Sequence, residues 1–284
     1  MARSPKFANS LASIPDTLVL LGAGKMGGAM VDGWLARKLP PKKLVVIEPQ
    51  PSKAIKALAR RGVRINPKAL DQAGGIGKIA AVVIAVKPQT APEALPALAA
   101  LVDKNTVVVS IMAGRTLGFL EGALPGAALV RAMPNTPAAI GRGITVAVGN
   151  ARVTAPAKRL AQALLAATGS VEWVDDEALM DAVTAVSGSG PAYVFLLAEA
   201  MAQAGVAAGL PAALSERLAR ETVAGSGELL HRSPLPAATL RGNVTSPGGT
   251  TAAALELLMG RDGLVPLMTR AVAAAAKRGR ELAG

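Results

Sequence analysis

The stretch from Thr17 to Gly27, Thr-Leu-Val-Leu-Leu-Gly-Ala-Gly-Lys-Met-Gly, decides the fold. Its first five residues are apolar or β-branched, which is typical of a strand buried on both faces. A helix predicted over Met26–Ala36 begins within the three glycines that follow. In such a turn Gly22 allows a sharp bend, Gly24 lets the backbone approach a pyrophosphate, and Gly27 lets the helix pack on the strand. The helix N-terminus also offers amides to phosphates, so the stretch predicts a dinucleotide-binding turn.

Composition excludes several kinds of catalytic site. The 284 residues contain no cysteine, which removes disulfides, thiolate zinc sites and thiolate catalysis. A single histidine disfavours Ser-His-Asp triads and histidine-rich metal sites. We therefore expect no metal, a reducing cytoplasmic location, and chemistry that needs little acid–base catalysis.

The chain is basic without a nucleic-acid-binding pattern. Its formal net charge is +12, but the 31 Lys and Arg are scattered, and aromatic residues make up only 2%. Single-strand binders need aromatic stacking platforms, so we expect no nucleic-acid partner. The longest apolar runs, such as Ala80–Val86, are far shorter than the roughly 20 residues that span a bilayer, so we expect no membrane partner either. The charge is better suited to attracting anionic small molecules.

The first half of the chain alternates strands with helices. After the first strand and helix we predict strands at Leu44–Ile47, Ala81–Val86, Thr106–Ile111, Ala128–Met133 and Ile144–Val148, and helices at Ser52–Arg61 and Ala91–Leu101. Strands that are apolar on both faces and separated by helices predict a parallel, doubly wound sheet. The fold class is therefore α/β, with an N-terminal Rossmann-type sheet over residues 17–171 that follows a flexible tail at residues 1–16.

The second half, residues 172–284, is predicted to be entirely helical. Gly-Pro and Pro-Gly breaks separate helices at Asp176–Ser187, Pro191–Ala208, Ala212–His231, Gly249–Met259 and Leu264–Leu282. These helices are rich in Ala on more than one face, so a lone unit would leave apolar surface in water. We therefore expect this half to be a dimerisation domain that pairs with a second copy.

Glu48 ends the second predicted strand, where an acidic side chain can bind the adenosine ribose hydroxyls. A 2′-phosphate would be repelled there, which favours NADH over NADPH. Two alternatives stay open: Glu48 is a solvated residue at a strand end, or Ser52 and Lys53 accept a 2′-phosphate.

Three further motifs carry chemistry. Ala85–Pro88 and Arg131–Pro137 each end a strand at the carboxyl edge of the sheet, where ligands bind in such folds. Ser246–Thr251 places two Gly and two Thr at a helix N-terminus, which suits a carboxylate. Its alternative is an ordinary loop with a Thr cap. The alternatives for Lys87 and Asn135 are a solvated charge and a turn cap.

With Ser187–Tyr193 and Asn243–Thr251 added, the chain from about residue 17 to 282 resembles the pyrroline-5-carboxylate reductase family. The last two motifs, in this order and spacing, are specific to that family. The resemblance implies reduction of the cyclic imine 1-pyrroline-5-carboxylate to L-proline, the last step of proline biosynthesis, with NADPH or NADH. It also implies a homodimer through interlocked C-terminal helices, and a ring of such dimers is an open possibility.

The resemblance implies a set of site residues. Thr251 is the expected catalytic residue, and the expected substrate contacts are Glu177, Gly248, Gly249, Thr250 and Thr251. The expected cofactor contacts are Gly22, Ala23, Gly24, Lys25, Met26, Gly27, Glu48, Asn66, Ala85, Val86, Lys87, Pro88, Ile111, Met112, Ala113, Asn135 and Asn243. Glu177 can also be read, with Asp175 and Asp176, as one of three acids in the first turn of a helix.

The proposed chemistry fits a chain with one histidine. The imine nitrogen is basic enough to be protonated near neutral pH, so no strong general acid is required. A β-hydroxyacid dehydrogenase would need a catalytic Lys, and no Lys occurs between Lys158 and Lys277. An imine reductase of wider substrate range remains an alternative, and a non-catalytic nucleotide-binding scaffold is a remote one.

Overall fold

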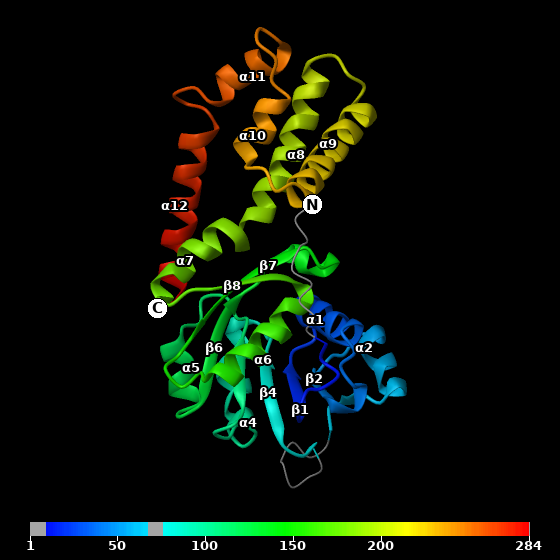
Figure 1. Cartoon of the computed structure of the whole chain (residues 1–284), viewed down its shortest axis with the longest axis vertical. Helices are drawn as coiled ribbons and strands as arrows, with labels where there is room; N and C mark the ends of the chain where they lie inside the picture. Colours follow the sequence, from blue (N-terminus) through cyan, green and yellow to red (C-terminus); the bar gives the residue numbers. More distant parts are fainter. Residues whose placement is uncertain (1–9, 68–75, 284) are drawn as a thin grey trace. The chain divides into compact units, whose positions relative to one another are not determined.

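The computed structural model describes residues 10–67 and 76–283, which form two compact units (Figure 1). The sheet unit comprises residues 10–188 and 276–283 within these ranges, and the helical unit comprises residues 189–275. The final helix begins in the helical unit and ends in the sheet unit.

The sheet unit is built on an eight-stranded sheet of the described residues, in the order β3-β2-β1-β4-β5-β6-β7-β8. The strands are β1 Thr17–Leu21, β2 Leu44–Ile47, β3 Arg64–Ile65, β4 Ile79–Ile84, β5 Val107–Ser110, β6 Ala128–Met133, β7 Gly143–Gly149 and β8 Gly169–Trp173. In the centre, Leu20 pairs with Val46 on one side and Val83 on the other. The predicted strand β1 is confirmed without a shift, and so are β2 and β6.

One part of the sheet prediction is wrong, because β7 runs antiparallel to β6 rather than parallel. The connection from Met133 to Gly143 contains only the short 3-10 helix η5 Thr136–Ile140. A parallel return needs a crossover of a dozen or more residues, which this connection is too short to provide. The strand β8 was also missed, because the last predicted strand was Ile144–Val148.

Helices cover both faces of the sheet. They are α1 Lys25–Ala36, α2 Lys53–Ala57 with its 3-10 extension η2 Leu58–Arg61, α3 Ala91–Ala94, α4 Pro96–Ala99, α5 Leu117–Ala123, α6 Ala155–Leu165 and α7 Met180–Val183. Trp34 of α1 and Leu164 of α6 share one core cluster with Leu20, whereas Leu98 and Leu120 share the other with Val19. Alternate residues of β1 therefore face opposite cores, as its uninterrupted apolar sequence predicts.

Two predicted helices are broken. Ser52–Arg61 changes from α to 3-10 geometry at Leu58, and Ala91–Leu101 is interrupted between Ala94 and Pro96. A proline nitrogen carries no hydrogen, so Pro96 cannot donate the hydrogen bond that would continue the helix. The helix expected at Asp176–Ser187 begins with the 3-10 turn η7 Glu177–Leu179 and ends in a π-helix, Thr184–Gly188.

Residues 10–16 differ from the expected flexible tail, whose residues 1–9 lie outside the described residues. Leu11 and Ile14 are buried, and the amide of Leu11 donates to the carbonyl of Arg37 over 2.8 Å. Lys43 Nζ donates to the carbonyl oxygens of Ile14 and Pro15. This segment therefore packs on the sheet unit immediately before β1.

The helical unit consists of α8 Gly190–Ala207, α9 Ala212–Arg232, α10 Ala237–Asn243, α11 Thr250–Leu258 and most of α12 Leu264–Ala283. Buried Ser215 of α9 donates its hydroxyl to the carbonyl of Ala202 over 2.6 Å, and a side chain on Gly205 would collide with it. Small residues thus let α8 and α9 pack closely. In the isolated chain, however, Phe195 and Leu196 of α8 are each 62% exposed. No helix of the described residues is long and apolar enough to span a bilayer.

Candidate dinucleotide and substrate site

The glycine turn lies between β1 and α1, as its sequence predicts. Gly22 has φ +90°, and a Cβ atom there would lie 2.7 Å from the carbonyl oxygen of Ala85. Glycine is therefore required by both conformation and space. Gly24 is the N-cap of α1, and no side chain caps the helix. The amides of the first turn, which begins at Lys25, are thus suited to an anion.

Backbone hydrogen bonds hold together the chain segments that leave β2, β1, β4 and β5. The amide of Gly22 donates to Ile47, Ala85 donates to Leu21, and Ile111 donates to Ile84, over 2.8, 2.7 and 3.0 Å. These segments share the carboxyl edge of the sheet. The chain order reverses at β1, which lies between β2 and β4. Ligands of open α/β sheets bind at such a switch point.

Glu48 connects the end of β2 to the glycine turn. Its Oε2 accepts a hydrogen bond of 2.8 Å from the amide of Ala23, and its Oε1 accepts one of 3.0 Å from the amide of Gln50. Asn66 binds the backbone of Glu48 twice: Oδ1 accepts from its amide and Nδ2 donates to its carbonyl, both over 2.8 Å. The sequence pointed to Glu48 and Asn66 but not to these contacts.

The segments after β4 and β5 are also joined. Arg115 donates from Nη2 to the carbonyl of Pro88 over 2.9 Å and stacks over the Phe119 ring at 4.5 Å. Lys87 is exposed and Met112 is buried, with the Met112 amide 3.3 Å from Ser110 Oγ. Among the other expected cofactor contacts, Ala85, Val86 and Ile111 are half-buried and Ala113 is exposed. Sequence reasoning missed Arg115, whose partner lies 27 residues away.

Asn135 and Glu177 also take part in hydrogen bonds of the sheet unit. Oδ1 of Asn135 accepts from the amide of Ile144 over 3.0 Å, which joins the end of β6 to β7. Oε1 of Glu177 accepts from Nη1 of Arg131 and from the amide of Leu117, both over 2.8 Å. Arg131 is only 5% exposed, so the carboxylate balances a buried cation. No pattern in the sequence indicated this pair.

The remaining expected site residues belong to the helical unit. Gly248 has φ +68°, Gly249 is the N-cap of α11, and Thr250 and Thr251 are the first two residues of that helix. No threonine side chain caps α11, so the ordinary Thr-capped loop is not what forms. Asn243 is the last residue of α10 and is exposed.

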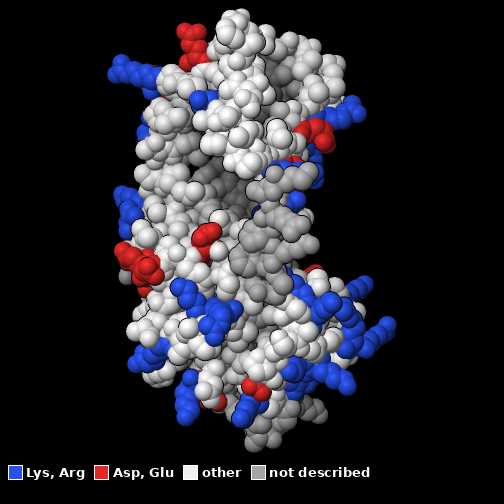
Figure 2. Space-filling view, viewed as in Figure 1, with Lys and Arg blue, Asp and Glu red and all other residues white. Residues whose placement is uncertain are grey.

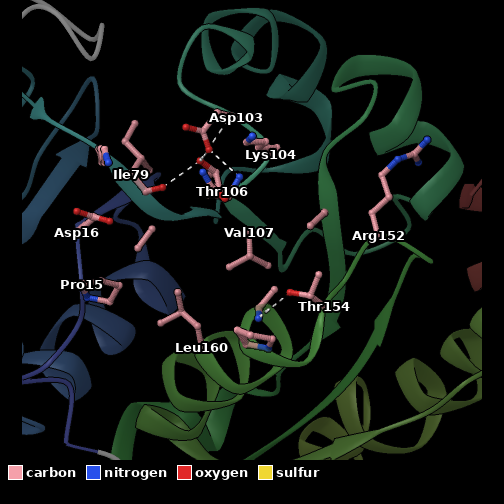
Figure 3. A pocket seen from close by; sticks show the side chains of 16 residues that line it. Pro15, Asp16, Ile79, Asp103, Lys104, Thr106, Val107, Arg152, Thr154 and Leu160 are labelled. Atoms are coloured by element: carbon pink, nitrogen blue, oxygen red, sulfur yellow. Dashed lines mark hydrogen bonds between the residues drawn. The ribbon is translucent and has the colours of Figure 1, made fainter.

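Two other kinds of site could compete with this one, a metal centre and the cavity shown in Figure 3. The described residues contain no group of three or more His, Cys, Asp or Glu that could hold a metal ion. A cavity of about 570 Å³ opens where β4 and β5 begin, at the edge opposite the glycine turn (Figure 3). There Thr106 donates to the carbonyl of Ile79 and is 3.1 Å from Asp103 Oδ1. Its lining carries charges of both signs, so it is poorly suited to a polyanion.

Comparisons with known proteins identify the family. A family model described as pyrroline-5-carboxylate reductase dimerisation matches residues 177–282, and one described as NADP oxidoreductase, coenzyme F420-dependent, matches residues 17–114. The pyrroline-5-carboxylate reductase of Synechocystis sp. is 39% identical over 266 residues, which cover 93% of this chain and 97% of that protein. The chain belongs to the pyrroline-5-carboxylate reductase family.

Solved structures of the pyrroline-5-carboxylate reductase family match both units. The enzyme of Coxiella burnetii has a TM-score of 0.86 and 32% identity, covering 95% of this chain and 99% of that one. The Plasmodium falciparum enzyme with NADP bound has a TM-score of 0.76 and 28% identity, with the same coverage. The predicted family and fold class are therefore confirmed.

The family match also explains the exposed apolar surface of the helical unit. Residues 177–282 correspond to a dimerisation domain, so this half of the chain carries homo-oligomeric assembly. Phe195 and Leu196 of α8 are among the exposed apolar side chains of this domain.

Proposed function

We propose that the chain reduces 1-pyrroline-5-carboxylate to L-proline, the last step of proline biosynthesis, with NADPH or NADH in the cytoplasm. The observation that carries this proposal is the glycine turn at the switch point of the sheet, in a chain that is similar to pyrroline-5-carboxylate reductases along both halves. An imine reductase of other specificity is the alternative.

The residues of the glycine turn fit a dinucleotide. Any side chain on Gly22 would fill the space beside Ala85, and the uncapped first turn of α1 can donate to a pyrophosphate. We assign Gly22–Gly27 to the pyrophosphate and Glu48 to the adenosine ribose, with Asn66 beside it. The side chains and backbone of Ala85–Pro88, Ile111–Ala113 and Asn135 would position the nicotinamide ring. Asn243 is the remaining proposed cofactor contact.

When bound, the cofactor supplies the hydride that is transferred to the imine carbon. Because the substrate nitrogen is protonated before it binds, the protein needs no strong general acid. Its task is to orient the cofactor and the imine and to exclude water. The uncapped N-terminus of α11 suits the substrate carboxylate, because the free N–H groups of its first turn form the positive end of the helix dipole. We assign Gly248 and Gly249 to this receptor and the hydroxyls of Thr250 and Thr251 to the carboxylate and ring nitrogen.

Glu177 remains a proposed substrate contact. Both hydrogen bonds to its carboxylate go to Oε1, so Oε2 would contact the substrate.

For assembly we propose a homodimer through the helical unit, with a ring of dimers as the next level. In that dimer the helices of two copies would bury the apolar side chains that one copy exposes.

The decisive experiment is an absorbance assay at 340 nm with pyrroline-5-carboxylate and each cofactor in turn. We expect cofactor oxidation that requires the imine. A panel of cyclic imines without the carboxylate is the control, and they should react far more slowly. Faster reduction of those imines would favour the imine reductase, while a folded protein that binds dinucleotide without turnover would contradict both.

A further inference from the structure

Asn66 occupies an unusual position at the edge of the sheet. It follows β3, the two-residue edge strand that pairs with β2 at Val45 and Val46 only. Its backbone has φ +46°, and its amide donates to the carbonyl of Val46 over 2.9 Å. The backbone ladder between β2 and β3 ends there.

The side chain of Asn66 continues that ladder by one residue. Its amide group donates to the carbonyl of Glu48 and accepts from the amide of Glu48, both over 2.8 Å, as a neighbouring strand would. Asn66 is therefore bound to Glu48, which directly follows β2 and whose side chain reaches the glycine turn. The two bonds use one Nδ2 hydrogen and one lone pair of Oδ1, and together they hold the amide plane of Asn66 against the backbone of Glu48.

The carboxylate of Glu48 is fixed by two hydrogen bonds and keeps acceptor sites for a ligand. A carboxylate has about four lone-pair sites, and the amides of Ala23 and Gln50 take one each. Two acceptor sites remain, which matches the two hydroxyls of an adenosine ribose. A 2′-phosphate would face this negative charge, and the Ala23 amide that could bind it is already taken.

Because the sequence around Glu48 is rich in basic residues, the position of its carboxylate decides which cofactor the site favours. Between residues 33 and 67 Glu48 is the only acid, whereas Lys53, Lys56, Arg60 and Arg61 lie on α2 and η2. Figure 2 shows Lys and Arg side chains crowding the surface of this region. Without a fixed carboxylate, this positive surface would favour the more highly charged NADPH.

We propose that Asn66 is a positioning residue for cofactor selection, which acts by holding Glu48 against the glycine turn and not by touching the cofactor. This inference rests on the proposed function in assuming that the chain binds a nicotinamide dinucleotide with Glu48 at the adenosine ribose. It differs from the simple contact that family resemblance implied for Asn66. The specific prediction is that the effect of Asn66 on cofactor choice passes through Glu48.

The test is a double-mutant cycle on the full chain, with NADH and NADPH dissociation constants measured by fluorescence titration in the absence of imine. Asn66→Ala should weaken NADH binding about 5- to 10-fold, as expected for the loss of two hydrogen bonds, and leave NADPH binding unchanged or tighter. Glu48→Ala should shift the preference at least as far. In the Glu48→Ala background, Asn66→Ala should have no further effect on the NADH-to-NADPH ratio.

Controls separate positioning from folding and from the proposed reaction. Asn66→Gly keeps the positive φ without the side chain, so it should reproduce Asn66→Ala with an unchanged melting temperature. Asn105→Ala, at the opposite edge of the sheet, should leave both dissociation constants unchanged. Equal weakening of both cofactors, or an effect that persists without Glu48, would overturn the proposal. Because only binding is measured, failure of the enzyme to reduce the imine would not affect the result.

Discussion

Thr251 is the proposed substrate contact whose role a single substitution tests most directly. Thr251→Val keeps the shape of the side chain but removes its hydroxyl from the start of α11. Loss of a buried polar partner costs about 1–3 kcal/mol, so kcat/KM for the imine should fall roughly 5- to 150-fold while cofactor affinity is unchanged. Steady-state kinetics with both substrates varied would measure this.

A matched control is Thr269→Val on α12, whose hydroxyl donates to the carbonyl of Val265 one turn earlier. It should leave kcat/KM unchanged. If Thr251→Val weakened imine and cofactor equally, or neither, Thr251 would have a structural role only.

The glycine turn separates conformation from ligand contact. Gly22→Ala forces a side chain into a backbone with φ +90° and against Ala85, so it should lower the free energy of unfolding by about 2 kcal/mol or more. Gly24 has ordinary φ and no atom within 4 Å of an added Cβ. Gly24→Ala should therefore keep the melting temperature and weaken dinucleotide binding. Calorimetry and fluorescence titration would distinguish the two, and tight binding by Gly24→Ala would contradict close approach of a pyrophosphate.

At this scale, local patterns were predictable and long-range contacts were not. The positive φ of Gly22 and the position of Gly24 at the start of α1 follow from their spacing between a strand and a helix. The bonds of Glu48 to Ala23 and Asn66 span 25 and 18 residues. They depend on which strands become neighbours, and one sequence without its sheet order cannot show that.

Among the elements, Glu177 of η7 joins two others. It pairs with Arg131 of β6 and accepts a hydrogen bond from Leu117 at the start of α5. Glu177→Ala would leave the Arg131 side chain, which is 7% exposed, without its carboxylate. We expect a loss of about 2 kcal/mol or more in the free energy of unfolding, measured in urea at fixed protein concentration. Glu281→Ala, which breaks an exposed pair with Arg278, should cost less than about 0.5 kcal/mol. Similar losses for the two variants would refute a structural role for the buried pair.

Elements were predicted well where hydrophobic pattern decides them and poorly where connection length does. The apolar runs of β1, β2 and β6 fixed their bounds, because both faces of these strands are buried. The reversed direction of β7 depends on the short link through η5, which hydrophobicity does not encode. The edge strand β8 alternates half-buried and exposed residues, a weaker signal than a continuous apolar run.

In the whole molecule, charge and apolar surface are divided between the two halves of the chain. Residues 177–284 contain nine basic and nine acidic side chains, so the formal net charge of +12 lies in residues 1–176. The half that holds the glycine turn thus attracts anions, whereas the helical half is neutral. A neutral, apolar surface is suited to self-association.

Self-association of the helical half should make folding and assembly one transition. In the isolated chain α8, α10 and α11 contain no buried residue, so one copy has little core of its own in this unit. The melting temperature of the full chain should therefore rise with protein concentration. Leu196→Glu places a charge on the α8 surface, where the side chain is 62% exposed, and should dissociate the oligomer and abolish activity together. Ala59→Glu, an equally drastic change at an exposed position of the sheet unit, should do neither. Light scattering that finds the full chain monomeric at micromolar concentration and fully active would contradict this view, because the exposed helices would then need no second copy.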